Sequence, residues 1–467
     1  MLKKVKVRNL QHEQRYAFLL NFLIIFIILA VSDFILPQSG PIGTRSMAVL
    51  YMMDGILTLS FMYLLEKYTI TSTDLYEQAV ITVLSSIYTC VIASTVNLIF
   101  FTSLVKLIAD IIIAFAKILS VLIIDFLINY TFNNTKYYQK PKLLIIDSSA
   151  ENFARMKKIK YGVLKNYDSW YENMESVNAE AFQQFTEEQF PHYDAVCILD
   201  GLSSSKYHIA VNTAMRLNMD LFIVPRIIDV GKTHARFVRL DDVLTLYMPK
   251  KSLSQVELGV KRIMDIIIAS IGLIITLIPM AFIAAAIKIT SPGPVFYKQV
   301  RLTQHKKKFY IYKFRTMIPD AEKLSGPKFS EKNDPRITPI GKILRGCRMD
   351  ELPQLINVLK GDMSIVGPRP ERPVFVESFA KEIENYEYRF AVKASLTSLS
   401  HVYGRYSTYI HDRTYYDLFY ITHYSMFLDF KIILLTTKTI FLKSAAEGED
   451  DFKQKTIIHA NTEVNIC

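Results

Sequence analysis

Five long runs of hydrophobic residues divide the chain. Four cover residues 16–36, 46–65, 79–101 and 104–130, and the fifth covers residues 263–289. Each reaches the ~20 residues that a helix needs to cross the hydrocarbon core of a bilayer. The pattern therefore predicts a four-helix transmembrane region in residues 1–135, a soluble region after it, and then one further membrane segment.

Basic residues on both sides of the first four runs indicate their orientation. Residues 1–15 carry five lysines and arginines, and residues 136–142 carry three lysines. Because basic loops stay on the cytoplasmic side, both ends of this region should be cytoplasmic. The fourth run also contains charges: Lys106 and Asp110 lie one helical turn apart and can pair, and Asp125 is expected near the interface.

Residues 140–250 have the pattern of a soluble α/β domain. Short apolar runs at residues 142–147, 194–200 and 221–226 are typical of buried parallel strands. A dinucleotide site would place glycines directly after the first strand, but residues 148–151 are Ser-Ser-Ala-Glu. We therefore expect a Rossmann-like fold with a structural or regulatory role.

The fifth run contains Pro279 near its middle. An interior proline removes a helix hydrogen bond and bends or breaks the helix. A straight span would carry the following lysine-rich segment to the outer side, against the usual distribution. We therefore favour a re-entrant helix that bends at Pro279, returns, and keeps a mainly α-helical region, residues 253–445, in the cytoplasm. A polar tail, residues 446–467, follows.

The composition is that of a membrane protein that meets phosphate groups. Hydrophobic residues make up 51% of the 467 residues, the mean hydropathy is +0.20 and the formal net charge is +11. A basic membrane protein is suited to anionic membrane lipids or phosphorylated substrates. No nucleic-acid-binding module is recognisable, so no nucleic acid is expected. The four cysteines show neither metal-ligand nor disulfide spacing.

Two adjacent carboxylates, Asp350 and Glu351, precede a segment that predicts a helix over residues 352–360. A helix N-terminus stabilises negative charge, so Asp350 should stay ionised and act as a nucleophile. Glu351 is suited to Mg²⁺, which takes one or two carboxylates and leaves its other positions to water and substrate phosphate. The alternative is an ordinary helix start with an acidic first turn.

Several cations lie near these carboxylates in the sequence. Arginine binds phosphate well because its planar guanidinium donates two parallel hydrogen bonds. For each cation the alternative is a solvated surface charge, but their grouping with the carboxylates favours phosphate binding. The candidates are Arg345, Arg348 and Arg369 close to the carboxylates, and Lys313 and Arg315 upstream.

Residues 261–442 resemble the bacterial sugar transferases, the polyprenyl-phosphate phosphoglycosyl transferases with a re-entrant membrane helix. The resemblance extends to the large members with four N-terminal helices and a soluble domain. It implies a multi-pass protein of the bacterial inner membrane with a cytoplasmic catalytic domain. The segments that carry it are residues 261–265, 291–296, 312–317, 334–338, 350–355, 357–364 and 367–371.

The resemblance implies a covalent, two-step reaction. Asp350 would attack the β-phosphate of a UDP-sugar and release UMP, and undecaprenyl phosphate would then take the hexose 1-phosphate. The lipid product would start an exopolysaccharide, capsule or O-antigen-type glycan. Glu351 would hold Mg²⁺, and a homodimer is one assembly left open. The residues implied in phosphate or substrate binding are Lys313, Arg315, Arg345, Arg369 and Pro370.

The chain departs from the family pattern in three places: a loop at residues 394–402, Ile278 before Pro279, where a serine is often found, and the soluble domain, which lacks the glycines of a nucleotide-binding version. Many members have Pro-Gly-Leu-Thr-Gly and then Ala-Gln-Val, where residues 394–398 are Ala-Ser-Leu-Thr-Ser and residues 400–402 are Ser-His-Val. The fit of the nucleotide or sugar depends on this loop. Two other classes remain: a membrane scaffold that has lost activity, and a transporter that uses the charges of the fourth run. The intact Asp350–Glu351 pair and the large soluble fraction argue against them.

Overall fold

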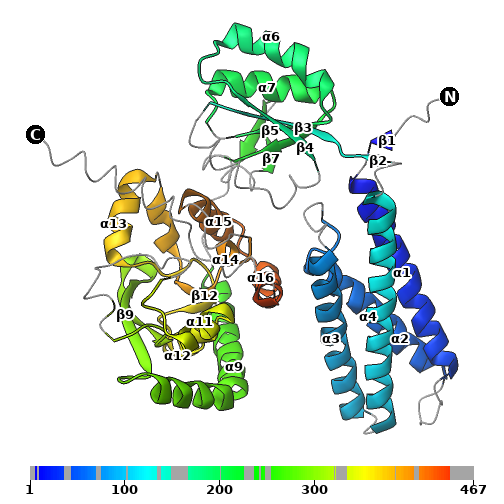
Figure 1. The fold of residues 1–467 in the computed structure, drawn as a ribbon, viewed down its shortest axis with the longest axis vertical. Helices are drawn as coiled ribbons and strands as arrows, with labels where there is room; N and C mark the ends of the chain where they lie inside the picture. The colour runs from blue at the N-terminus through cyan, green and yellow to red at the C-terminus, as the bar shows by residue number, and fades with distance from the viewer. Residues whose placement is uncertain are drawn as a thin grey trace, which may run out of the picture. The chain divides into compact units, whose positions relative to one another are not determined.

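The computed structural model divides the chain into two compact units, Met1–Arg226 and Ile227–Cys467 (Figure 1). The residues that the structure describes are 6–7, 10–35, 44–69, 75–100, 104–133, 138–148, 167–199, 201–225, 236–240, 243–247, 254–319, 321, 334–383, 385–403 and 410–441. The predicted tail at residues 446–467 lies outside them, and the predicted domain boundaries remain predictions.

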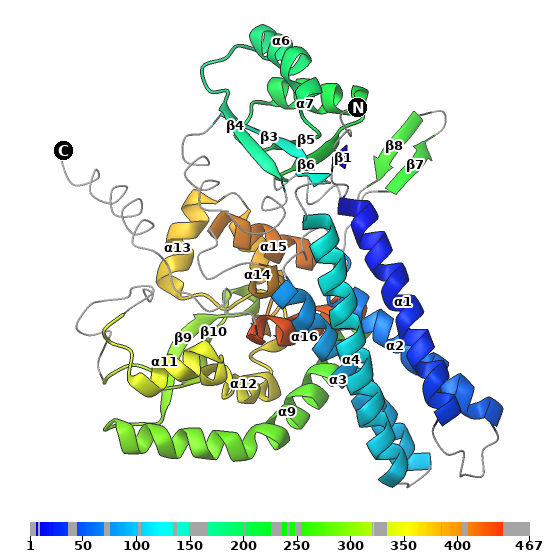
Figure 2. The same cartoon turned by 45° about the vertical axis from the view of Figure 1, so that its right-hand side comes forward.

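Four helices that pack side by side begin the first unit (Figures 1 and 2). They are α1 (Leu10–Ile35), α2 (Thr44–Leu64), α3 (Leu75–Phe100) and α4 (Leu104–Asn133). In α1, α3 and α4 the apolar stretch is long enough to cross a membrane, and the described apolar part of α2 is Met52–Leu64. Large apolar side chains such as Leu98 and Phe115 point outward, as expected of helices that face lipid.

Two lysines are buried between these helices, each with a carboxylate. Lys67, which follows α2, lies 2.7 Å from Asp125 of α4, and Lys117 of α4 lies 2.7 Å from Asp54 of α2. Charges away from water need such partners. Asp125, expected near the interface, is therefore a buried half of an ion pair. The Lys106 side chain lies outside the described residues, so its pairing with Asp110 stays a prediction.

A short strand β1 (Lys6–Val7) before α1 pairs with β2 (Tyr138–Gln139) after α4. The segments before the first helix and after the fourth are thus hydrogen-bonded to each other. This pairing requires both segments to lie at the same end of the helices, which agrees with an even number of crossings.

A parallel sheet of four strands follows, in the order β4-β3-β5-β6. The predicted strands form β3 (Lys142–Asp147), β5 (Ala195–Ile198) and β6 (Asp220–Ile223). The fourth, β4 (Asp168–Asn173), is an exposed edge strand. Helices α6 (Ala179–Gln189) and α7 (Ser204–Arg216) pack together over one face of the sheet in both views (Figures 1 and 2). An α/β fold is confirmed, and its Rossmann-like form stays a prediction.

The second unit is mainly helical. After the hairpin β7 (Arg236–Leu240) and β8 (Val243–Tyr247) comes the long helix α9 (Gln255–Thr290), then a second antiparallel hairpin, β9 (Phe296–Leu302) and β10 (Lys308–Phe314). The remaining elements are α11 (Pro339–Gly346), α12 (Gln354–Lys360), β11 (Ser364–Val366), α13 (Pro373–Glu382), β12 (Ser395–Thr397), α14 (Leu399–Tyr403), α15 (Ile410–Thr422) and α16 (Met426–Phe441). β11 and β12 pair in parallel and pack against α9, α12 and α16.

Helix α9 is bent into two arms in both views (Figures 1 and 2). It starts with a capping box, in which Ser254 accepts from the Glu257 amide and Glu257 accepts from the Ser254 amide. Pro279 lies inside the helix, where it cannot donate a helix hydrogen bond. Residues on either side, including Ile274 and Phe282, expose apolar side chains. The helix is thus bent, apolar and long enough to enter a membrane.

The contribution of the ion pair between α2 and α4 to the stability of the four-helix bundle can be tested by substitution. Lys117→Ala should lower the free energy of unfolding in detergent by about 3–5 kcal/mol, because Asp54 would remain buried without its cation. Thermal unfolding measures this loss. Replacing both partners, Asp54→Leu with Lys117→Met, should recover most of this loss. Glu187→Gln, which removes an exposed pair with Arg216, should cost less than about 1 kcal/mol. A double variant as unstable as the single one would contradict this assignment.

Candidate active site

Asp350 and Glu351 lie in a 3-10 turn, η4 (Met349–Glu351), and not in the first turn of a helix. The helix expected over residues 352–360 begins only at Gln354 and is seven residues long. The turn is entered through Arg348, whose backbone is left-handed with φ 54°. Pro353 occupies the N-cap position of α12 without a side-chain capping hydrogen bond, and it has no backbone N–H with which to continue the helix hydrogen bonds back into the turn. The carboxylates are therefore set apart from the helix that was expected to stabilise them.

Two cations bind Glu351 through the same oxygen. Lys313 Nζ on β10 lies 2.7 Å from Glu351 Oε1, and Arg369 Nη2 lies 3.1 Å from it. Burial acts to raise the pKa of Glu351, but the charges of Lys313 and Arg369 outweigh it and hold the pKa well below its usual value. Glu351 therefore stays ionised.

Asp350 is buried beside Glu351, with 8% of its surface exposed. Burial raises the pKa of Asp350, against the opposing charges of Lys313, Arg345 and Arg369. This direction is opposite to the one expected from a helix N-terminus. Lys313 and Arg369 act on both carboxylates and Arg345 acts on Asp350, so these three cations lie close to the pair, and their phosphate-binding role stays a prediction.

Close packing between α11, α12 and the β10 strand brings the cations to the pair. Arg345 stands in the last turn of α11, and its Nε donates to Thr316 Oγ1 at 2.9 Å. A Cβ at Gly341 would lie 2.1 Å from the Thr316 carbonyl oxygen, so only glycine lets α11 approach this closely. The Asn357 side chain of α12 accepts from the amide of Tyr312 and donates to the carbonyl of Tyr310, which fixes α12 against β10.

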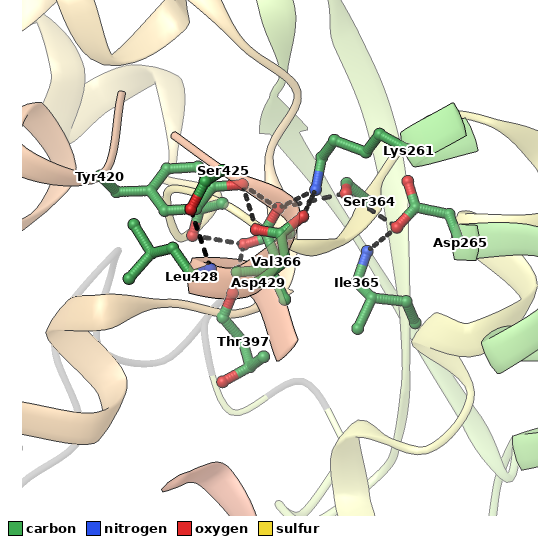
Figure 3. Close-up of polar contacts among 12 residues, drawn as sticks. Lys261, Asp265, Ser364, Ile365, Val366, Thr397, Tyr420, Ser425, Leu428 and Asp429 are labelled. Atoms are coloured by element: carbon green, nitrogen blue, oxygen red, sulfur yellow. Dashed lines mark hydrogen bonds and ion pairs between the residues drawn. The ribbon is translucent and has the colours of Figure 1, made fainter. Parts of the chain in front are cut away.

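Helix α9 holds the strand that leads into the loop with Arg369 (Figure 3). Asp265 Oδ1 accepts from Ser364 Oγ at 3.0 Å and from the amide of Ile365 at 2.9 Å. Lys261 Nζ donates to the Val366 carbonyl at 3.0 Å. The first arm of the apolar helix thus fixes all three residues of β11.

The same lysine also joins α9 to α16. Lys261 Nζ lies 2.6 Å from Asp429 Oδ2, and the Tyr420 hydroxyl donates to Asp429 Oδ1 at 2.8 Å (Figure 3). Burial raises the pKa of Asp429 against the charge of Lys261. The next residue of α9, Arg262, donates to the carbonyls of Val358 and Leu359 at the end of α12.

Arg389 and His401, which the sequence did not single out as site residues, both contact Arg369. Arg389 Nη2 donates to the Arg369 carbonyl at 2.9 Å and lies 2.7 Å from Asp417. Burial raises the pKa of Asp417 to about 6. The Arg369 side chain is shared, since its Nη1 hydrogen-bonds His401 Nε2 while Nη2 faces Glu351. His401 belongs to the loop that departs from the family pattern, which was the only signal in the sequence.

Arg315 does not join this group. Its Nη1 and Nη2 donate to the carbonyls of Pro292 and Ser291 at 2.8 and 2.7 Å. The phosphate-binding role expected for it therefore gains no support, and its contacts fix the turn that follows α9. Pro370 lines a small cavity of about 20 Å³ together with Lys313, Glu351 and Arg369.

The carboxylates fit a metal ion only if a substrate supplies further ligands. Among the described residues there is no group of three or more histidine, cysteine, aspartate or glutamate side chains that could hold one. Mg²⁺ accepts such a sparse site, because it keeps water and binds substrate phosphate beside one or two carboxylates. Glu351 is ionised and already contacts two cations through Oε1, and its role as a Mg²⁺ ligand stays a prediction.

Comparison with known proteins gives a consistent result. The model of the bacterial sugar transferase family matches residues 256–443. A putative undecaprenyl-phosphate N-acetylgalactosaminyl 1-phosphate transferase from Bacillus subtilis is 52% identical over 132 residues, which cover 28% of this chain and 73% of that protein. The UDP-N-acetylgalactosamine-undecaprenyl-phosphate N-acetylgalactosaminephosphotransferase of Aeromonas hydrophila is 41% identical over 184 residues, 39% of this chain and 43% of that protein.

A third relative matches over a longer part of the chain than the family model does. The galactosyl transferase CpsE of Streptococcus agalactiae is 31% identical over 335 residues, which cover 69% of this chain and 71% of that protein. The aligned part of this chain thus spans less than half of the Aeromonas protein but over two-thirds of the other two.

The contacts between α9 and β11 predict a stability effect. Asp265→Ala would leave the Ile365 amide buried without its acceptor and the Ser364 hydroxyl with the Val366 carbonyl alone, so the free energy of unfolding should fall by about 1–3 kcal/mol. Asp265→Asn keeps one acceptor oxygen and should lose clearly less. Thermal unfolding in detergent measures both. Equal stability of Asp265→Ala and the unsubstituted chain would contradict a supporting role for Asp265.

Proposed function

The chain belongs to the bacterial sugar transferase family, in its large form, and from this premise we propose its reaction. It transfers a hexose 1-phosphate from a UDP-sugar to undecaprenyl phosphate, with release of UMP. The lipid-linked product begins the synthesis of a surface polysaccharide. The observation that carries the proposal is the convergence of Lys313 and Arg369 on Glu351, next to the buried Asp350.

Such a site is suited to moving a phosphoryl group. An Asp350 oxygen forms a bond to the β-phosphorus of the UDP-sugar, and the bond from that phosphorus to the oxygen shared with the α-phosphate breaks, so UMP leaves. A phosphate oxygen of undecaprenyl phosphate then attacks the same phosphorus and restores the carboxylate. Covalent catalysis of this kind replaces one difficult displacement with two easier ones.

The surrounding cations give the site its electrostatic character. Lys313, Arg345 and Arg369 face the place where negative charge gathers on the phosphate oxygens, and such preorganised charges stabilise the transition state. Mg²⁺, held by Glu351, would neutralise oxygens of the diphosphate. Burial of Asp350 removes water that would otherwise solvate the carboxylate and hydrolyse the intermediate.

The bent apolar helix supports a membrane location for this chemistry. We propose that α9 enters the inner membrane from the cytoplasm, turns at Pro279 and returns. The lipid phosphate and the soluble nucleotide can then reach one site at the membrane surface. The transporter alternative is disfavoured, because two of the charges that it would use, Lys117 and Asp125, are buried partners of Asp54 and Lys67.

The carboxylate pair can be tested directly. Asp350→Asn keeps the shape but removes the attacking charge, so UMP release should fall at least about 1,000-fold. Glu351→Gln and treatment of the unsubstituted protein with EDTA should also abolish release. The assay uses undecaprenyl phosphate with UDP-N-acetylgalactosamine, UDP-galactose and UDP-glucose in turn.

Glu382→Gln, on the exposed face of α13, is the control and should remain fully active. Near-normal UMP release by Asp350→Asn would rule out the covalent route. Full activity in EDTA would remove the metal from the mechanism.

The proposed topology predicts a labelling pattern. After replacement of the natural cysteines, Val256→Cys in the first turn of α9 and Lys298→Cys on β9, after the helix, should react with a membrane-impermeant maleimide only in permeabilised cells. Ser39→Cys, between the first two predicted spans, should react in intact cells and serves as the positive control. Reaction of the cysteine at position 298 in intact cells would show that α9 crosses the membrane.

A further inference from the structure

Arg369 lies between an acid and an imidazole. Its Nη2 donates to Glu351 Oε1, and its Nη1 contacts His401 Nε2. A guanidinium is always charged and can only donate. Nε2 of His401 must therefore be the acceptor, which places the ring proton on Nδ1 and makes the imidazole neutral.

Surrounding groups favour this neutral form. Burial and the charges of Arg369 and Arg348 hold the pKa of His401 well below its ordinary value. The ring is also fixed through its backbone, because the His401 amide donates to Ser398 Oγ at 3.0 Å in the first turn of α14. The imidazole therefore presents one acceptor at a defined position.

We propose that His401 is a positioning residue for the transferase reaction. Its Nε2 holds one end of the Arg369 guanidinium, so the other end stays directed at Glu351 and the phosphate site. This inference rests on the proposed function and adds a residue to it. It also accounts for the departure from the family pattern, since a glutamine in the corresponding place can supply a neutral acceptor at a similar distance from the backbone.

Kinetics can distinguish a positioning role of His401 from a role in packing alone. A residue that only fills space would affect folding, whereas a positioning residue affects catalysis through Arg369. Without the acceptor, Arg369 gains rotational freedom that it must lose again in each transition state. The loss should therefore appear mainly in kcat for UMP release, with a smaller change in KM for the UDP-sugar.

The experiment compares four single variants in the UMP-release assay. His401→Ala and His401→Leu should lower kcat/KM about 10- to 100-fold, the effect expected when a charged group loses a hydrogen-bond partner. His401→Gln should retain a third or more of the activity. Ser400→Ala, one residue away and bonded to Ser398, is the matched control and should be unchanged.

A double-variant cycle then separates the two roles. In an Arg369→Ala background, His401→Ala should cause no further loss, because its effect acts through the arginine. Independent losses that multiply would overturn the proposal, as would a fully active His401→Ala. Unfolding of both His401→Ala and His401→Leu, at temperatures where His401→Gln is folded, would assign His401 to stability and would also overturn it. Absence of UMP release from the unsubstituted chain would instead reject the proposed function itself, and this inference with it.

Discussion

Two neighbouring carboxylates can be buried together only if cations lie close to them, and this constraint organises the catalytic unit. Burial acts to raise the pKa of both Asp350 and Glu351. Lys313 and Arg369 keep Glu351 ionised, and their contacts with it are direct. Since these cations come from a hairpin and from a distant loop, both must be fixed relative to the 3-10 turn. Much of the packing around the turn serves that end.

The apolar helix and the site are parts of one structure. The first arm of α9 fixes the end of α12 through Arg262 and fixes β11 through Lys261 and Asp265. Those two elements lie directly after the carboxylates and directly before Arg369. If α9 lies in the membrane as proposed, the lipid surface and the reacting groups share a rigid connection. A displacement of the helix would then change the separation of the cations from the acids.

Elements marked by a run of apolar residues or by a motif could be predicted from the sequence, whereas contacts that arise only when the helices pack could not. Strands β3, β5 and β6 were evident from their apolar residues, but β4 is a polar edge strand and gave no such signal. Lys313 and Arg369 could be predicted to lie near the carboxylates, because each is a cation within a segment that matches the family. Arg315 has the same motif, yet it donates to backbone carbonyls. The partners of Asp54 and Asp125 could not be predicted, because Lys67 and Lys117 reach them only through helix packing.

The central claim is that Asp350 carries the phosphosugar between the two half-reactions. The most direct measurement is mass spectrometry of peptides from the full chain after incubation with a UDP-sugar alone, without undecaprenyl phosphate. The account predicts a hexose-phosphate adduct on the peptide that contains Asp350, formed with UMP and lost when undecaprenyl phosphate is added. Release of UMP only when both substrates are present, with no adduct at any time, would contradict it.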